Sequence, residues 1–325
     1  MSNPVLVFID HDRGAVGDDT RQAFAFARAC LPDAAVAAVV IGGDTTPAVT
    51  GADTIWHVRH AELDDYAPEA WGDALHQLAA EVTPSAIVTT GTERGNEVLA
   101  HVAAIADEPF AANVVAATPG APWQIRRARW GGSLLEDATL TAVLPILSCA
   151  LHAYPSDPST TSTTSTTSNP NVAEFVPVLQ PDAGRTRIVD RVQVAEGITL
   201  TTAPVVVSGG RGVGSEEGFA AIEALAELLG GAVGCSRVVT NQGWRPHADQ
   251  VGQTGKRVAP DLYIACGISG AIQHWVGMQA AKQILAINLD RDAPMVTKAD
   301  YAVIGDLHEV IPAIVDEIRR RRAAT

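Results

Sequence analysis

The chain has 325 residues, 47% of them hydrophobic and 18% charged, which is an ordinary globular balance and enough for about two domains with sizeable cores. Its formal net charge of −14 argues against nucleic acid or an anionic membrane as the main partner. Four widely spaced cysteines include no Cys-x-x-Cys pair, so they favour buried free thiols in a reducing compartment over a metal ribbon or a redox dithiol.

In the first half, short apolar runs alternate with stretches of helical periodicity. The run at 5–9 stops at Asp10, far too short for a signal peptide or a membrane span, so we expect a cytoplasmic protein that is not embedded in a membrane. Strands are predicted at 5–9, 35–41 and 86–90, and helices from Asp19 or Thr20 to about Cys30, near 68–82, and from the turn at 90–95 through 106. This alternation predicts a parallel sheet covered on both faces, followed by strand-like runs between 112 and 151.

Residues 156–170 are of low complexity, with a Ser-Thr-Thr repeat that begins at Ser159 and lies between two prolines. Such a segment cannot bury apolar area, so we predict a mobile surface loop within the first domain. Two interpretations of this segment stay open: a solvated insertion that the surface tolerates, and a target for modification. Apolar runs at 172–179 and 187–194 follow before the second half begins.

The alternation starts again near Gly197. Strands are predicted at 204–208, 237–240, 262–266, 283–288 and 301–304, with a helix around Phe219 that ends at Gly230-Gly231 and a last helix over 307–322. We therefore predict an α/β fold of two doubly wound units. The N-terminal domain would span 1–196, and a Rossmann-like C-terminal domain with a parallel sheet would span 197–325.

Glycine-rich or polar stretches follow four predicted strands of the second half, at 208–212, 268–271, 288–290 and 305–306. Ligands of open α/β sheets bind at the carboxyl ends of the strands, so these loops describe a nucleotide-sized cleft. The first loop could cradle a phosphate on its backbone. It is spaced Gly-x-Gly-x-Gly and lacks the dinucleotide fingerprint, so a plain tight turn is the alternative.

Two further stretches have polar chemistry. Residues 250–256 carry small and amide groups suited to hydrogen bonding a polar heterocycle, and Arg257 excludes a P-loop. In residues 267–274, Ser269 could cap a short helix that places His274 about one turn inside, either as a structural histidine or as a ligand-binding one. No nearby acidic or cysteine cluster completes a site with His57 and His60, and no acid–base pair accompanies the cleft, so we expect neither a metal nor catalytic residues.

These segments resemble the flavin domain of electron transfer flavoprotein alpha subunits. The resemblance runs from about Val205 to Ile318 and rests on residues 208–212, Ser236-Arg237, 250–263, 267–274 and 286–288 with Ala293-Pro294. The first half is similar more loosely, through 99–104 and 127–134. Asn241 stands where the family commonly has Asp.

The resemblance implies FAD as the cofactor and gives each residue a place along it. Arg211 would lie at the phosphates, Ser236 would hydrogen-bond the cofactor, and Arg237 would pack near the isoalloxazine ring. Gln250, Val251, Gly252, Gln253 and Thr254 would line the ring edge; Ser269, Gly270, Ala271, Ile272, Gln273 and His274 would run from the phosphates to the N1/C2 end of the ring; Asn288, Asp290, Asp306 and Leu307 would hold the adenosine. A cation or a hydrogen-bond donor beside the ring would favour reduced flavin.

The same resemblance implies an electron carrier that forms a heterodimer with a beta subunit. It would take electrons from flavoprotein dehydrogenases, as in fatty acid β-oxidation, and pass them to a membrane quinone oxidoreductase. Three alternatives stay open: a flavin- or NAD-dependent dehydrogenase, a non-redox nucleotide-binding or scaffolding module, and an electron-bifurcating member of the same family.

Overall fold

The computed structural model describes residues 3–12, 14–17, 20–43, 46, 49, 51–154, 170–189 and 198–323. The chain folds as two compact units, one that takes in Met1–Trp130 and Leu134–Val192 and one that takes in Gln193–Thr325. Nearly all of the predicted Ser/Thr-rich loop lies outside the described residues. The predicted domain boundary between residues 196 and 197 also falls on residues outside this set. The loop and the boundary therefore both stay predictions.

The N-terminal unit is built on a nine-stranded mixed sheet in the order β11-β5-β4-β1-β6-β10-β7-β8-β9. The strands are β1 (Val5–Phe8), β4 (Val36–Ile41), β5 (Thr54–Val58), β6 (Ala86–Thr90), β7 (Phe110–Thr118), β8 (Trp123–Arg129), β9 (Leu134–Leu140), β10 (Ile146–Cys149) and β11 (Asn171–Phe175). All pairs are parallel except β7 with β8 and β8 with β9. A separate antiparallel pair joins β2 (His11–Asp12) and β3 (Ala15–Val16).

Helices cover both faces of this sheet, as the alternation predicted. They are α1 (Thr20–Cys30), α2 (Pro68–Val82) and α3 (Glu93–Ala106), with short 3-10 turns η1 (Ala61–Leu63) and η2 (Trp130–Gly132). Phe24 and Phe26 of α1 belong to the core on one face, and Trp71 of α2 and Val98 of α3 belong to the core on the other. The prediction missed β5, where Trp56 and other half-buried residues obscure the apolar signal.

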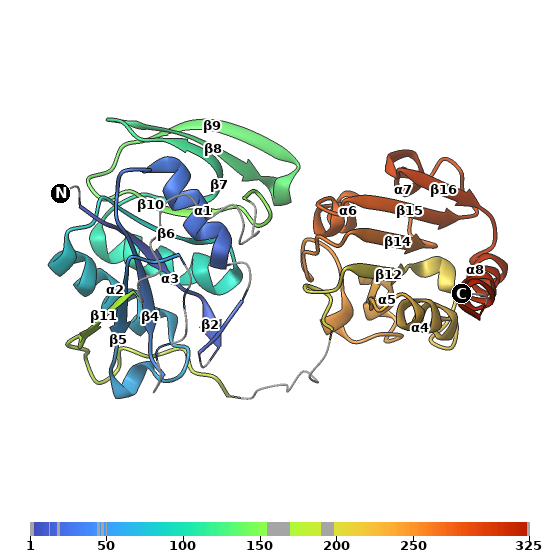
Figure 1. Ribbon diagram of the computed structural model, residues 1–325, viewed down its shortest axis with the longest axis horizontal. Coiled ribbons are helices and arrows are strands. Elements are labelled where there is room, and N and C mark those ends of the chain that lie inside the picture. The colour runs from blue at the N-terminus through green and yellow to red at the C-terminus, as the bar shows by residue number, and fades with distance from the viewer. Residues whose placement is uncertain are drawn as a thin grey trace. The chain divides into compact units, whose positions relative to one another are not determined.

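The C-terminal unit is built on a five-stranded parallel sheet in the order β13-β12-β14-β15-β16 (Figure 1). The strands are β12 (Val205–Gly209), β13 (Ala232–Cys235), β14 (Leu262–Cys266), β15 (Gln283–Asn288) and β16 (Tyr301–Ile304). The helices are α4 (Phe219–Leu228), α5 (Arg237–Asn241), α6 (Ile272–Met278), α7 (Pro294–Lys298) and α8 (Leu307–Ala323), with 3-10 turns η3 (Arg211–Val213) and η4 (His247–Asp249). A core lies on each face of the sheet. The predicted doubly wound α/β unit with a parallel sheet is confirmed.

One strand prediction in this unit is wrong: residues 237–240 form helix α5, and the strand is the preceding β13. The β-branched residues Val238, Val239 and Thr240 favoured a strand, but local propensity is weak against tertiary packing. Strand β13 was missed because it is short and contains Gly234, whose position leaves only 3.0 Å between an added Cβ and Val251 Cγ2. A small residue is needed there by packing, and small residues carry little strand signal.

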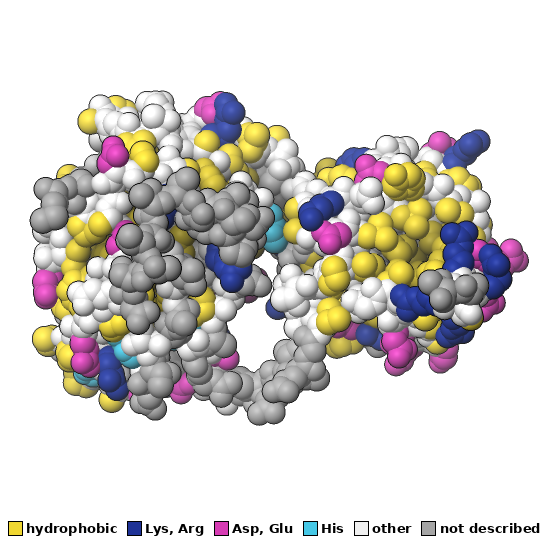
Figure 2. Space-filling model, in the orientation of Figure 1, with side chains coloured by type: hydrophobic (Ala, Val, Ile, Leu, Met, Phe, Trp, Pro, Cys, Tyr) yellow, Lys and Arg dark blue, Asp and Glu magenta, His cyan; other side chains and the backbone are white. Residues whose placement is uncertain are grey.

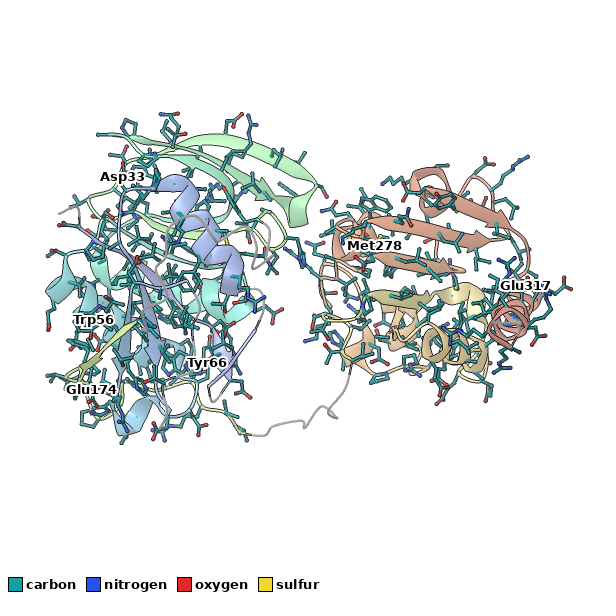
Figure 3. All side chains as sticks on the ribbon, in the orientation of Figure 1. Asp33, Trp56, Tyr66, Glu174, Met278 and Glu317 are labelled. Carbon is teal, nitrogen blue, oxygen red and sulfur yellow. The ribbon has the colours of Figure 1, made fainter. Side chains whose placement is uncertain are left out.

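None of the helices in the described part of the chain is long and apolar enough to cross a membrane. In α8, Glu317 (labelled in Figure 3) pairs with Arg320 and Arg321 at 2.7 Å each. The basic run at the end of this helix is therefore partly neutralised within the helix itself.

Candidate functional site

The carboxyl ends of all five C-terminal strands share one edge of the sheet, because the strands are parallel. The four predicted loops start from this edge, since Arg211 follows β12, residues 267–271 follow β14, Asn288 ends β15, and Asp306 follows β16. Ser236 and Arg237 follow β13 at the same edge. The chain leaves β12 for β13 on one side and later returns to β14 on the other. The carboxyl end of β12 is thus the topological switch point, the place where doubly wound sheets bind ligands.

At this switch point the two central loops are in close backbone contact. Gly210 N donates to Cys266 O at 2.8 Å, and Gly212 N donates to Gly267 O at 3.1 Å. A Cβ added to Gly212 would lie 2.8 Å from Gly267 Cα, so the glycines are required by the packing of one loop on the other. The loop makes a 3-10 turn at Arg211, and the packing of the two loops explains its glycines without a bound phosphate.

A row of backbone donors lies after β14. Among the described residues, the amide groups of residues 269–273 donate to no backbone or side-chain acceptor. Ser269 does not cap α6 as predicted; the helix starts later, with Ala271 at its N-cap and no side-chain cap. The hydroxyl and amide groups at this turn are left free, and several unpaired N–H groups together suit an anion such as a phosphate.

Arg211 and Arg237 are exposed and form no ion pair with the described residues. Arg245 is a useful contrast, because it pairs with Glu223 and Asp249 and lies over the Phe219 ring. The guanidinium group of Arg245 is thus paired within the fold, whereas those of Arg211 and Arg237 are available to an anionic ligand.

The loop at 250–256, between η4 and β14 in the chain, is hydrogen-bonded to both β13 and α6. Val251 N donates to Cys235 O at 2.9 Å, and Gln253 N donates to Gln273 O at 2.7 Å. The buried Gln250 side chain accepts from the Thr240 hydroxyl and donates Nε2 to Thr254 Oγ1, both at 2.9 Å. Because both polar ends of Gln250 are used by the protein, its side chain orients Thr254, whose own hydroxyl proton stays free to donate.

His274 is buried, with 7% of its surface exposed. Its Nε2 lies 2.9 Å from the Tyr263 hydroxyl, and its buried Nδ1 has no hydrogen-bond partner among the described residues. Burial lowers the pKa of His274 to about 4, and the backbone of Val251 acts in the opposite direction. The structure thus holds a neutral imidazole with one unused polar atom.

The residues predicted to hold adenosine are tied into turns. Asn288 Nδ2 donates to Ile268 O at 3.0 Å, and its Oδ1 accepts from Asp290 N at 3.1 Å. Asp306 Oδ1 accepts from His308 N at 2.9 Å and so caps α8. Leu307 is a core residue, so only its backbone is available to a ligand. Asn288 links the loop after β15 to the loop after β14.

Sequence reasoning missed Tyr263 and Thr240, whose hydroxyls hold His274 and Gln250. The available signal was a tyrosine inside the apolar run Leu-Tyr-Ile-Ala-Cys, because a buried hydroxyl needs a partner. His57, by contrast, is structural, since its Nδ1 lies 2.9 Å from Thr46 Oγ1 and its Nε2 lies 3.2 Å from Gly42 O.

Lowering the pH should destabilise the C-terminal unit through His274. The unfolded state binds a proton near pH 6.5 and the native state only near pH 4, so the free energy of unfolding should fall as the pH drops through this window. We expect a loss on the order of 2–3 kcal/mol, absent in His274→Asn. Thermal unfolding of both proteins between pH 7 and 4 measures this; parallel curves would contradict it.

Within the described residues, unpaired amides, two guanidinium groups without ion pairs and an unpaired buried imidazole nitrogen thus lie in the loops and helix starts that follow the strands of one sheet. This set fits a phosphate-bearing cofactor with a hydrogen-bonding heterocycle. The fold and the site define the C-terminal unit as a nucleotide-cofactor-binding α/β domain.

Comparison with known proteins gives the family. Residues 5–175 match the electron transfer flavoprotein domain, and residues 199–279 match the electron transfer flavoprotein FAD-binding domain. The chain is 36% identical to the electron transfer flavoprotein subunit alpha of Mycobacterium leprae and 32% identical to that of Bacillus subtilis, over 98% of each chain in both cases. It is 32% identical to the mitochondrial subunit alpha of Oryza sativa, over 96% of this chain and 90% of that one. The chain belongs to the electron transfer flavoprotein alpha subunit family, and its cofactor is FAD.

Proposed function

We propose that this chain is the FAD-carrying half of a cytoplasmic heterodimer that transfers electrons from flavoprotein dehydrogenases, such as those of fatty acid β-oxidation, to a membrane quinone oxidoreductase. The observation that carries the proposal is the convergence of the predicted loops on one sheet edge in a member of this family. Bound FAD supplies the redox chemistry, and the protein supplies binding, orientation and electrostatics. The chain itself is a carrier rather than an enzyme.

The free groups of the site suggest how each end of FAD is held. Arg211 and the amides of residues 269–273 would bind the phosphates. Ser236 is half-buried at the N-cap of α5 and makes no capping hydrogen bond, so its hydroxyl is available to the cofactor. Arg237, Thr254 and His274 would lie at the isoalloxazine ring. Asn288, Asp290 and Asp306 would shape the adenosine end.

A beta subunit is the partner that we propose, and exposed apolar surface supports this. All four residues of β16 are exposed, including Tyr301 (60%) and Ile304 (49%). Figure 2 shows hydrophobic side chains gathered over the C-terminal unit where β15 and β16 run. In the N-terminal unit, Trp130 is 80% exposed and Leu135 is 65% exposed. Such surface is typical of protein–protein interfaces.

Isolation of the tagged chain from its source, followed by flavin analysis and stepwise reduction, tests the proposal. We expect a two-chain particle with FAD that an acyl-CoA dehydrogenase and its substrate reduce, and that neither NADH nor the substrate alone reduces. Direct reduction by NADH would favour the bifurcating alternative or a dehydrogenase. A particle that never takes up flavin, even with FAD and a co-expressed beta subunit supplied, would refute the proposal.

A further inference from the structure

We propose that Tyr263 is a positioning residue of the flavin site: its hydroxyl donates to His274 Nε2 and so holds the neutral imidazole with its proton on Nδ1, as a donor toward the cofactor. The inference rests on the proposed placement of His274 beside the isoalloxazine ring.

The two side chains are held rigidly. Tyr263 is the second residue of β14 and has none of its surface exposed, and its hydroxyl is 2.9 Å from His274 Nε2 on α6. The rings meet edge to face, with centroids 6.1 Å apart and planes at 60°. Apolar packing around Tyr263, from Val206, Val251 and Met278 among others, fixes the hydroxyl, so the imidazole has one preferred orientation.

The direction of this hydrogen bond follows from the two groups. Phenol is a better donor than a neutral imidazole N–H, and an imidazole nitrogen is a better acceptor than a phenol oxygen. Burial raises the pKa of Tyr263, so the hydroxyl keeps its proton. The hydroxyl of Ser208, which is buried on β12, opposes this shift.

The consequence for His274 is a choice of tautomer. A neutral imidazole carries one proton, and with Nε2 accepting from Tyr263 that proton must lie on Nδ1. Nδ1 makes no hydrogen bond within the described residues, although the Val251 backbone raises the pKa of His274, and a buried N–H without a well-formed hydrogen bond is unfavourable. A flavin carbonyl at the pyrimidine end is an acceptor whose negative charge grows on reduction, so a fixed donor there favours reduced flavin. The opposite tautomer would present a lone pair and disfavour it.

Histidine-selective ¹⁵N NMR of the assembled flavoprotein, assigned with His274→Asn, shows which ring nitrogen of His274 is protonated. We expect Nδ1. A proton on Nε2 in the wild-type protein would overturn the proposal, and this measurement does not depend on any substitution at Tyr263.

The midpoint reduction potential of the flavin supplies the second readout. Tyr263→Phe keeps the buried ring and should weaken the binding of reduced relative to oxidised flavin by about tenfold. The midpoint potential should therefore fall by about 59 mV for one electron. Tyr154→Phe removes the same hydroxyl in the N-terminal unit, where it donates to Val115 O at 3.2 Å, and should leave the potential unchanged. Equal potentials in the two variants would overturn the proposal.

A double-variant cycle separates this inference from the proposed function. In a His274→Asn background, Tyr263→Phe should have no further effect; an equal shift in both backgrounds would show that Tyr263 does not act through His274. If His274→Asn binds flavin with an unchanged potential, the placement of His274 beside the ring is wrong. The NMR result would still decide whether Tyr263 sets the tautomer.

Discussion

Gly270→Ala should weaken FAD binding by at least about 100-fold, and the assembled protein should purify largely without flavin. Gly270 has φ +84°, which costs an alanine about 1–2 kcal/mol. Its new Cβ would also clash with the backbone nitrogen of Met295 and lie 2.7 Å from Met295 Cα. The loop after β14 would have to move away from α7, which breaks the 3.1 Å bond from Met295 N to Ser269 O and displaces the free amides of residues 269–273.

Gly214→Ala is the matched control for this substitution. Gly214 has nearly the same φ, +86°, but nothing lies within 4 Å of an added Cβ. It should lose about 1–2 kcal/mol of stability from backbone strain alone and keep its FAD. Flavin absorbance per chain, FAD titration and thermal unfolding compare the two. Full flavin content in Gly270→Ala would contradict the role we give to the loop after β14.

Asn288→Asp should weaken FAD binding by about 30- to 100-fold, because the new carboxylate cannot donate to the Ile268 carbonyl that Asn288 Nδ2 now contacts at 3.0 Å. Two oxygen acceptors would face each other, and the loops after β14 and β15 would separate. The added negative charge would also lie in a site proposed to bind phosphates. Protonation of the aspartate restores a donor, so the defect relative to wild type should shrink as the pH is lowered.

Asn241→Asp introduces the same charge at an exposed position at the end of α5, where the Asn241 side chain makes no hydrogen bond with the other described residues. Its FAD affinity should stay within a few-fold of wild type. Titration of both apoproteins with FAD at pH 8 and pH 6 measures the two effects. A similar loss in both variants would mean that charge, rather than the Asn288–Ile268 bond, controls affinity.

Much of the framework could be read from local sequence. Continuous β-branched runs such as residues 205–207 predict buried parallel strands, and the 3.6-residue spacing in α4 and α8 predicts amphipathic helices, because both patterns follow from short-range geometry. The positions of glycine-rich and polar loops after those strands then predict a ligand site at one edge, since parallel strands share a carboxyl edge.

The sequence by itself thus determined the α/β class, most strands and helices, and which loops meet at the candidate site. Only the tertiary structure decided the helical state of Arg237 to Thr240, the absence of a cap at Ser269, the bridging of Thr240 and Thr254 by Gln250, and the pairing of Tyr263 with His274. These outcomes depend on which polar groups packing brings within hydrogen-bond distance and removes from water. Such partners lie on different elements, so no local pattern specifies them.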